Sequence, residues 1–303
     1  MKTIKTILAV AAALLLAASC NKAEAPAGEG LTVNYSVSVP ATKALGEGAA
    51  INKVWYAVYR TDGSLVSNYQ AVDFTGGSAN CPVVMMRGQS YKVLFVAQHY
   101  ADATTPAYAI DPATATLTMP TAAVANSDNY DIFTFVDEVT NYDGAPADAV
   151  RLERKVAQVN FSCNDADWAN AEVLGMLPTH SAVTLTSVPK TYSLLTGTPS
   201  TETVTLSYAK AARPEGECNL ATVFCFVGAS DASTDFTTNA TLSLYTSVDQ
   251  EDAARTLTVD NLPVKSNHKT NVIGNIMTGS VGYTVTINPA SDPASDPINH
   301  PLQ

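Results

Sequence analysis

Apolar and polar residues alternate with a period of two along most of the chain, and this pattern predicts β-strands rather than helices. The clearest strand covers residues 31–39, whose alternate positions are all apolar: Leu31, Val33, Tyr35, Val37 and Val39. The same criterion predicts strands over residues 54–59, 65–74, 82–86, 91–98, 115–119, 130–139, 151–161, 182–187, 203–208, 221–227, 240–245, 255–259 and 282–287. Trp55, Tyr56 and Tyr59 alternate with apolar neighbours and are predicted to pack in a core. Only residues 167–177 indicate a short helix.

The segments between these strands are rich in Gly, Pro, Asn, Asp and Ser, which favours turns between antiparallel strands. No glycine-rich phosphate-binding pattern opens a helix, so the pattern does not favour a parallel sheet with crossover helices. A chain of 303 residues has room for two domains. We therefore predict an all-β protein with two antiparallel β-sandwich domains, covering residues 31–150 and 151–289.

The last residues, 290–303, differ from the rest of the chain. Proline recurs at positions 289, 293, 297 and 301. Proline lacks the backbone N–H that a central strand needs. We therefore predict an extended, flexible tail for this segment.

Composition narrows the range of functions. The formal net charge is −11, and no stretch has the density of Lys and Arg that phosphate neutralisation requires. No nucleic-acid partner is therefore expected. Four histidines and five cysteines are scattered and fit neither a metal cluster nor a Cys/His nucleophile pair. The sequence predicts no catalytic residues, metal or cofactor, and hence no enzyme.

An acidic cluster is the remaining candidate for a metal site. Asp128, Asp131, Asp137 and Glu138 lie close together in the sequence, but they lack the periodicity of a calcium-binding loop. A solvated acidic face is the preferred interpretation.

The N-terminus has the features of an export signal. Lys2 and Lys5 precede an apolar stretch that is too short to span a bilayer, so residues 1–19 are predicted to be a signal peptide. The following AASC at residues 17–20 resembles a bacterial lipobox, which implies that Cys20 becomes the lipidated N-terminus. Residues 20–30 then form a lipidated tether rich in Ala, Gly, Glu and Pro. The alternative is an ordinary secretory signal that leaves Cys20 as a thiol.

The remaining cysteines are Cys81, Cys163, Cys218 and Cys225. An exported protein could pair them, but the sequence fixes no connectivity. Cys81, Cys163 and Cys225 lie beside apolar strand residues. Buried free thiols that pack as small hydrophobic groups are the preferred interpretation.

Three motifs resemble those of fimbrillins, the subunits of type V pili and related surface lipoproteins. VPATKAL at 39–45 resembles the segment cut by a trypsin-like protease, and LERKVAQV at 152–159 resembles the strand that connects the two domains. NHKTNVIGN at 267–275, followed by YTVTINP at 283–289, resembles the closing turn and final strand. The resemblance covers most of the chain after residue 20.

This resemblance implies two tandem transthyretin-like β-sandwich domains and a structural or adhesive role in a pilus at the outer membrane and cell surface. A lipid anchor would hold the precursor in the outer membrane. A trypsin-like maturation protease would then cut between Lys43 and Ala44 and remove the strand at 31–39. A strand from another pilus subunit would fill the resulting groove, because it gains main-chain hydrogen bonds and side-chain burial together.

One departure concerns the donated strand. The last 16 residues carry no alternating apolar run, unlike the C-terminal donor strand of many polymerising subunits. Either the donor lies elsewhere, such as at 282–287, or the protein is a tip, an anchor or a non-polymerising relative.

A monomeric surface lipoprotein that binds glycans is the alternative function. Such a module would expose flat aromatic side chains as binding platforms. Tyr100, Tyr108 and Tyr142 lie near predicted loops and are the candidates. This function predicts that residues 31–39 are retained.

Overall fold

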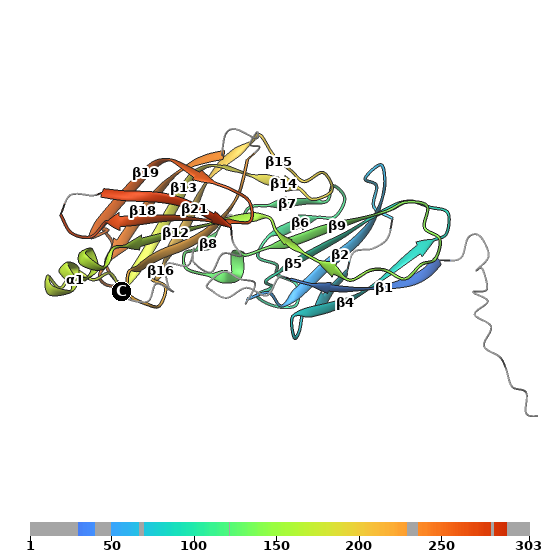
Figure 1. Ribbon diagram of the computed structural model, residues 1–303, viewed down its shortest axis with the longest axis horizontal. Coiled ribbons are helices and arrows are strands. Elements are labelled where there is room, and N and C mark those ends of the chain that lie inside the picture. Colours follow the sequence, from blue (N-terminus) through green and yellow to red (C-terminus); the bar gives the residue numbers. More distant parts are fainter. Residues whose placement is uncertain are drawn as a thin grey trace, which may run out of the picture.

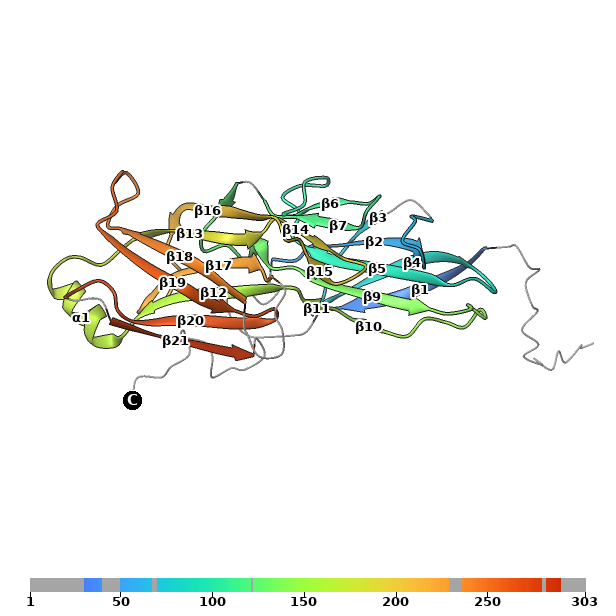
Figure 2. The same cartoon turned by 90° about the horizontal axis from the view of Figure 1, so that it is seen from above.

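The computed structural model describes residues 30–39, 50–66, 70–120, 122–228, 236–279 and 282–289. Two β-sandwiches lie end to end along the long axis of an elongated molecule (Figures 1 and 2). The predicted all-β fold is confirmed. Neighbouring strands are antiparallel except where β1 meets β10, β12 meets β20 and β8 meets β16.

The strands and helices have the following bounds: β1 Gly30–Ser38, β2 Lys53–Arg60, β3 Gln70–Asp73, β4 Ser78–Met86, β5 Tyr91–Gln98, β6 Ala109–Asp111, β7 Thr116–Thr118, β8 Ala123–Val124, η1 Asp128–Tyr130, β9 Phe133–Val139, β10 Val150–Arg151, β11 Glu153–Arg154, β12 Val156–Cys163, α1 Asp165–Val173, β13 His180–Pro189, β14 Thr191–Ser193, β15 Thr198–Pro199, β16 Thr203–Ala212, β17 Asn219–Phe226, β18 Phe236–Tyr245, β19 Arg255–Val264, β20 His268–Asn275 and β21 Gly282–Pro289.

The first sandwich consists of a three-stranded sheet, β10-β1-β4, and a five-stranded sheet, β11-β9-β5-β2-β3. Val33, Tyr35 and Val37 of β1 face residues such as Tyr56 and Phe95 of the second sheet within one buried cluster. The alternation that predicted β1 thus corresponds to one buried and one exposed face.

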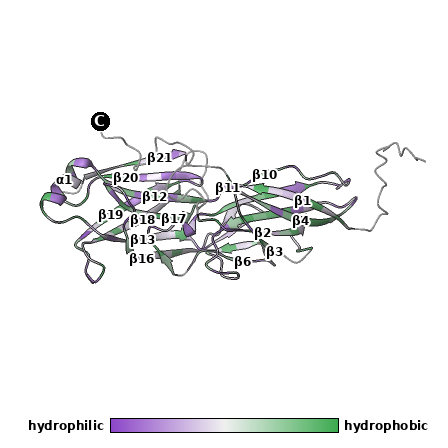
Figure 3. Cartoon of the chain, turned by 90° about the horizontal axis from the view of Figure 1, so that it is seen from below, coloured by the Kyte–Doolittle hydropathy of each residue, from purple (hydrophilic) through white to green (hydrophobic). Residues whose placement is uncertain are grey.

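The second sandwich pairs the sheet β17-β12-β20-β21 with the sheet β19-β18-β13-β16-β8. β12 and β17 are buried at every position. Green, hydrophobic residues and purple, hydrophilic residues both occur along the strands in Figure 3, and α1 also carries purple segments.

A fifth sheet, β15-β14-β7-β6, joins the two sandwiches. Trp55 and Tyr59 point away from the first core and belong to the large cluster that also contains Leu117 of β7 and Phe226 of β17. The five-stranded sheet of the first sandwich is therefore buried on both faces, which explains the nearly continuous apolar sequences of β2 and β5. The predicted core positions of Trp55, Tyr56 and Tyr59 are confirmed.

The predicted domain boundary between residues 150 and 151 does not separate the strands of the two sandwiches. Strands before the boundary pair with strands that follow it, and a strand after it pairs with the first sandwich. β8 pairs with β16 and β7 pairs with β14, so the chain joins the second sandwich well before residue 150. β11 pairs with β9 of the first sandwich after that point. The division into 31–150 and 151–289 stays a prediction about folding units.

The helix is shorter than predicted and begins earlier. The Asn164 side chain accepts a hydrogen bond from the Asp167 N–H and caps α1, and Gly175 has a positive φ of 66° just beyond its end. The helix therefore stops at Val173 instead of continuing to residue 177. No helix in the part of the chain that the structure describes is long and apolar enough to cross a membrane.

Candidate functional site

β1 is held very differently along its two edges. It pairs antiparallel with β4 over its whole length, from Gly30 opposite Met86 to Ser38 opposite Ser78. β10 meets the other edge in parallel only at Val37 and Ser38. Successive peptide groups of a strand point to opposite edges, so about half of the main-chain groups of β1 face that second edge. Among the described strands, none pairs with its first seven residues there.

The inner face of β1 is a major part of the first core. Val33, Tyr35 and Val37 are at most 4% exposed, and Leu31 and Val39 are half-buried. The ring of Tyr35 packs against Phe95 of the opposite sheet with centroids 5.0 Å apart. Burying a large apolar side chain contributes roughly 1.5–3 kcal/mol. These three alternating positions therefore provide most of the side-chain burial of this strand.

Tyr35 also connects the two sheets by a polar contact. Its hydroxyl donates a hydrogen bond of 2.7 Å to Oδ2 of Asp137 on β9. Burial is the main cause that raises the pKa of Tyr35 above its usual range, and the carboxylate of Asp137 raises this pKa further. Tyr35 therefore stays a neutral donor at physiological pH.

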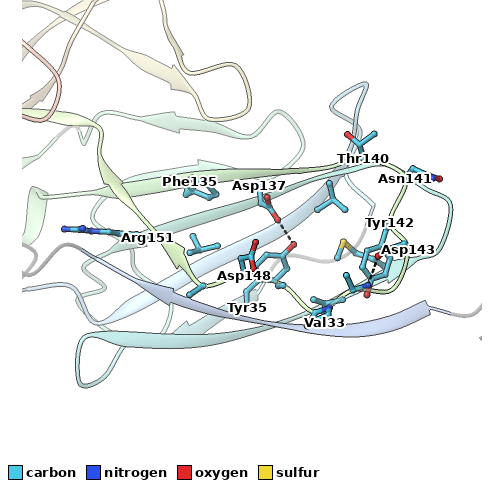
Figure 4. A pocket seen from close by; sticks show the side chains of 17 residues that line it. Val33, Tyr35, Phe135, Asp137, Thr140, Asn141, Tyr142, Asp143, Asp148 and Arg151 are labelled. Carbon is cyan, nitrogen blue, oxygen red and sulfur yellow. Dashed lines mark hydrogen bonds between the residues drawn. The ribbon is translucent and has the colours of Figure 1, made fainter. Parts of the chain in front are cut away.

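A cavity of about 760 Å³ lies beside the open edge of β1. It extends from Val33 and Tyr35 to Phe135 and Asp137 of β9 and to the segment 139–151 (Figure 4). Tyr35 and Asp137 point toward each other in this view, and Asp148 lines the same cavity. The site thus combines a strand edge, an apolar wall and several carboxylates.

The predicted lipidation and cleavage residues lie outside the described part of the chain. This holds for Cys20 and for the pair Lys43 and Ala44. β1 ends at Ser38, and β2 begins at Lys53, where it occupies the opposite sheet. A cut between Lys43 and Ala44 would therefore separate β1 from the chain without entering another described strand.

The segment that resembles a connecting strand passes through three sheets in sequence. Val150 and Arg151 pair with β1, Glu153 and Arg154 pair with β9, and β12 then enters the second sandwich. The expected single strand at 151–161 is therefore interrupted twice. Each interruption lets the chain change sheets.

Arg154 fixes this crossing through a buried ion pair. Its Nε and one terminal nitrogen donate to the two carboxylate oxygens of Asp131, both at 2.8 Å. Both side chains are at most 2% exposed, and the guanidinium also lies 5.3 Å from the centre of the Phe133 ring. The expectation of a solvated acidic face is wrong for Asp131, because the charge is buried against an arginine distant in sequence.

The prediction that three tyrosines form exposed platforms for a glycan is wrong. Tyr100, Tyr108 and Tyr142 are 6%, 0% and 6% exposed. The hydroxyl of Tyr108 donates to the Tyr130 carbonyl at 2.6 Å within the interior. All three side chains pack inside the protein instead of presenting a flat ring to solvent.

The described histidines bond to groups other than cysteine. His99 and His268 contact the backbone carbonyls of Ala50 and Ser266, and His180 contacts the hydroxyl of Thr179. Within the described ranges, no three His, Cys, Asp or Glu side chains are grouped to hold a metal ion.

β21 is an edge strand with little side-chain burial. It pairs with β20 from Gly282 to Pro289, and only Val285, Ile287 and Asn288 are half-buried. A Cβ atom at Gly274 would overlap the Gly282 carbonyl and lie 2.5 Å from Cα of Tyr283. Glycine at this position of the NVIGN motif therefore lets β21 approach β20.

The chain resembles the solved structure of a fimbrial assembly protein from Parabacteroides distasonis, with 15% identity, a TM-score of 0.46, and coverage of 86% of this chain and 96% of that one. A protein from Bacteroides ovatus, provisionally described as a cell adhesion protein, has 14% identity, a TM-score of 0.47 and the same coverage. A protein from Bacteroides thetaiotaomicron, provisionally described as polysaccharide binding, has 13% identity, a TM-score of 0.49 and the same coverage.

No curated protein matches the chain. One family model does, and it covers residues 25–295, which is most of the sequence. The chain therefore belongs to the family of unknown function DUF6562.

Proposed function

We propose that this chain is a non-enzymatic, lipid-anchored cell-surface protein of the fimbrillin type, a structural or adhesive pilus subunit assembled by protease-triggered strand exchange. The observation that carries the proposal is the position of β1. It supplies three fully buried side chains to the first core, yet the chain connects it to β2 only through a segment that contains Lys43 and Ala44. Once that segment is cut, only non-covalent contacts connect the C-terminal end of β1 to the sandwich.

Loss of β1 would create a groove suited to another strand. β4 would lose its main-chain partner along nine paired positions, and its inward-facing Cys81, Val83 and Met85 would become exposed. An unpaired edge beside an apolar trough binds an extended segment through backbone hydrogen bonds and alternating side chains. The large cavity beside β1 means that the groove is already partly open on one side.

β21 is the described strand that best fits this groove. Its alternate residues Tyr283, Val285 and Ile287 repeat the spacing of Val33, Tyr35 and Val37, and polar residues occupy the positions between them in both strands. β21 is also poorly buried in its own sheet, so little side-chain burial is lost when it leaves. We assign it as the donor strand for the next subunit.

Cleavage is tested first. The Lys43→Gln variant is expected to remain a precursor that begins at acylated Cys20 and to form no polymers, because β1 stays in place. The wild-type chain should begin at Ala44. Peptide mass spectrometry of surface protein reads the N-terminus, and gel electrophoresis without heating reads the polymers. Lys265→Gln, at an exposed lysine between β19 and β20, removes the same charge outside the cleavage segment; it is the matched control and should assemble normally. Polymers formed by uncleaved Lys43→Gln protein would contradict the proposal.

The donor strand is tested by charge on each of its faces. Val285→Asp is expected to reduce polymer formation at least about tenfold, because a buried unpaired carboxylate opposes insertion into the groove. Thr286→Asp, on the opposite face of β21, should assemble like the wild type. Thermal unfolding of the monomers checks that both variants are folded. Equal polymer yields from folded Val285→Asp and Thr286→Asp proteins would exclude β21 as the donor.

A glycan-binding lipoprotein is the second candidate, and the cavity beside β1 is the observation that favours it. Its volume lies within the usual range of ligand sites, and Asp137, Asp143 and Asp148 line it together with Phe135. The N-terminus of the native protein separates the two functions. A glycan-binding monomer keeps residues 31–39, whereas a matured pilus subunit lacks them.

A further inference from the structure

The four described cysteines fall into two classes. Cys81 on β4 lies in the core of the first sandwich, and Cys225 on β17 lies in the large shared cluster. Cys163 ends β12, and Cys218 directly precedes β17. Because β12 and β17 are neighbours in one sheet, the last two cysteines come together although they are far apart in the sequence.

Backbone and side-chain contacts connect Cys163 with Cys218. Ser162 is paired with Asn219, so the two cysteines are at the next position of the ladder, where the Cys163 N–H donates to the Cys218 carbonyl at 2.9 Å. The Cys218 thiol donates a hydrogen bond to Oδ1 of Asp165 on α1 at 3.4 Å, and each of the two thiols shifts the pKa of the other. Cys163 is buried in the large apolar cluster, and the half-buried Cys218 packs against that cluster.

The loop that carries Cys218 is fixed in place by Arg213. One guanidinium nitrogen donates to the carbonyls of Pro214, Gly216 and Asn219, at 3.0, 2.6 and 3.4 Å. The guanidinium also lies 4.6 Å above the ring of Trp168 on α1. The position of Cys218 relative to Cys163 is thus set by contacts that do not depend on sulfur chemistry, which lowers the cost of joining the two residues.

We propose that Cys163 and Cys218 form a disulfide when the protein meets an oxidising dithiol–disulfide exchange partner. The half-buried Cys218 sulfur, as thiolate, attacks the oxidant's disulfide and releases one oxidant thiolate. Cys163, as thiolate, then attacks the Cys218 sulfur and releases the second. The protein loses two electrons and two protons, and the oxidant's disulfide is reduced to two thiols. The inference needs contact with an oxidant and does not depend on the proposed role in a pilus.

The environment predicts which thiol reacts first and how its rate varies with pH. Burial is the main cause that raises the pKa of Cys218 to about 11; the carboxylates of Asp165 and Glu217 also raise it, whereas the Cys163 thiol lowers it. Burial, the neighbouring Cys218 and the carboxylate of Asp167 raise the pKa of Cys163 further. The thiolate is the reactive form. Cross-linking should therefore begin at Cys218 and should accelerate as the pH rises toward that value.

Disulfide mapping tests the proposal on the full-length lipidated protein. The protein is incubated with oxidised and reduced glutathione at mildly alkaline pH, free thiols are alkylated in denaturant, and peptides are identified by mass spectrometry. We expect a link between Cys163 and Cys218 and alkylated Cys81 and Cys225. A Cys225→Ala variant makes the assignment unambiguous, because Lys210 and Arg255 are the tryptic sites on either side of both Cys218 and Cys225.

A stability measurement keeps the test independent of the peptide map. Adding a reductant should lower the Tm of the oxidised wild-type protein by about 5–10 °C. The same shift should occur in Cys81→Ala and be absent in Cys218→Ala, which removes only a half-buried side chain. Full alkylation of Cys163 and Cys218 after oxidation, a link between another pair, or an equal shift in Cys218→Ala would overturn the proposal.

Discussion

Replacing Arg154 by methionine is expected to lower the free energy of unfolding by about 3–5 kcal/mol, because the variant leaves the carboxylate of Asp131 buried without its bidentate partner. The loss should appear in urea unfolding as a lower midpoint. Methionine is comparable to the arginine stem in length, so the effect reports on charge and hydrogen bonding more than on lost volume. A loss below about 1 kcal/mol would mean that water reaches the carboxylate.

Two further variants separate the ion pair from packing. The double variant Asp131→Asn, Arg154→Met removes both charges and should recover a large part of the lost stability. Lys155→Met is the matched control on the next residue, since Lys155 and its partner Glu153 are 25% and 67% exposed. An exposed pair contributes only about 0–1 kcal/mol. If Lys155→Met and Arg154→Met lowered the free energy of unfolding by similar amounts, the buried ion pair would not be the cause of the Arg154 effect.

The Asp167→Ala variant is expected to lower the free energy of unfolding by about 3–5 kcal/mol, because several buried donors lose one shared acceptor. The carboxylate of Asp167 accepts the N–H groups of Ile276 and Met277 at 2.7 Å, and both the N–H and hydroxyl of Thr278. It thereby ties α1 to the segment after β20. Glu172→Ala on the exposed side of α1 should change the stability by less than about 0.5 kcal/mol in the same urea titration.

The Asp167 contribution should also depend on pH in a defined direction. Burial opposes ionisation, but the donors from Ile276, Met277 and Thr278 outweigh it and lower the pKa of Asp167 below its ordinary 3.8. The unfolded chain therefore takes up this proton at a higher pH than the folded protein does. The contribution is complete well above pH 3.8 and is lost as the pH falls through the folded-state pKa. The stability difference between wild type and Asp167→Asn should shrink over that acid range.

The parts of the fold that depend on local alternation could be predicted from the sequence. The inner face of β1 and the core positions of Trp55 and Tyr59 follow from period-two patterns, which need no knowledge of the partner strand. Within the predicted strand at 65–74, the structure describes β3 at Gln70–Asp73. Its burial depends on pairing with β2, which alternation within one segment does not determine.

The contacts that could not be predicted from local sequence patterns all join segments that are distant in the sequence. The local pairs β6–β7 and β14–β15 become one four-stranded sheet only when β7 meets β14. Tyr108 looked like a loop residue, but the shared core covers it. Asp131 looked solvated because its neighbours in the sequence are acidic. The arginine that pairs with it, Arg154, follows 23 residues later on another strand. Cys163 and Cys218 similarly meet only after β12 and β17 have paired.

The direction of β1 has a mechanical consequence. β1 and β4 run along the long axis of the molecule (Figure 2), and β1 begins at the end of the first sandwich that lies away from the second sandwich. Tension along that axis would therefore load the nine paired positions of β1 and β4 in shear, all together, instead of peeling them apart one after another. In the proposed strand exchange, a replacement strand lying in the same groove along the same axis would be loaded in the same way. The filled groove would therefore resist a lengthwise pull.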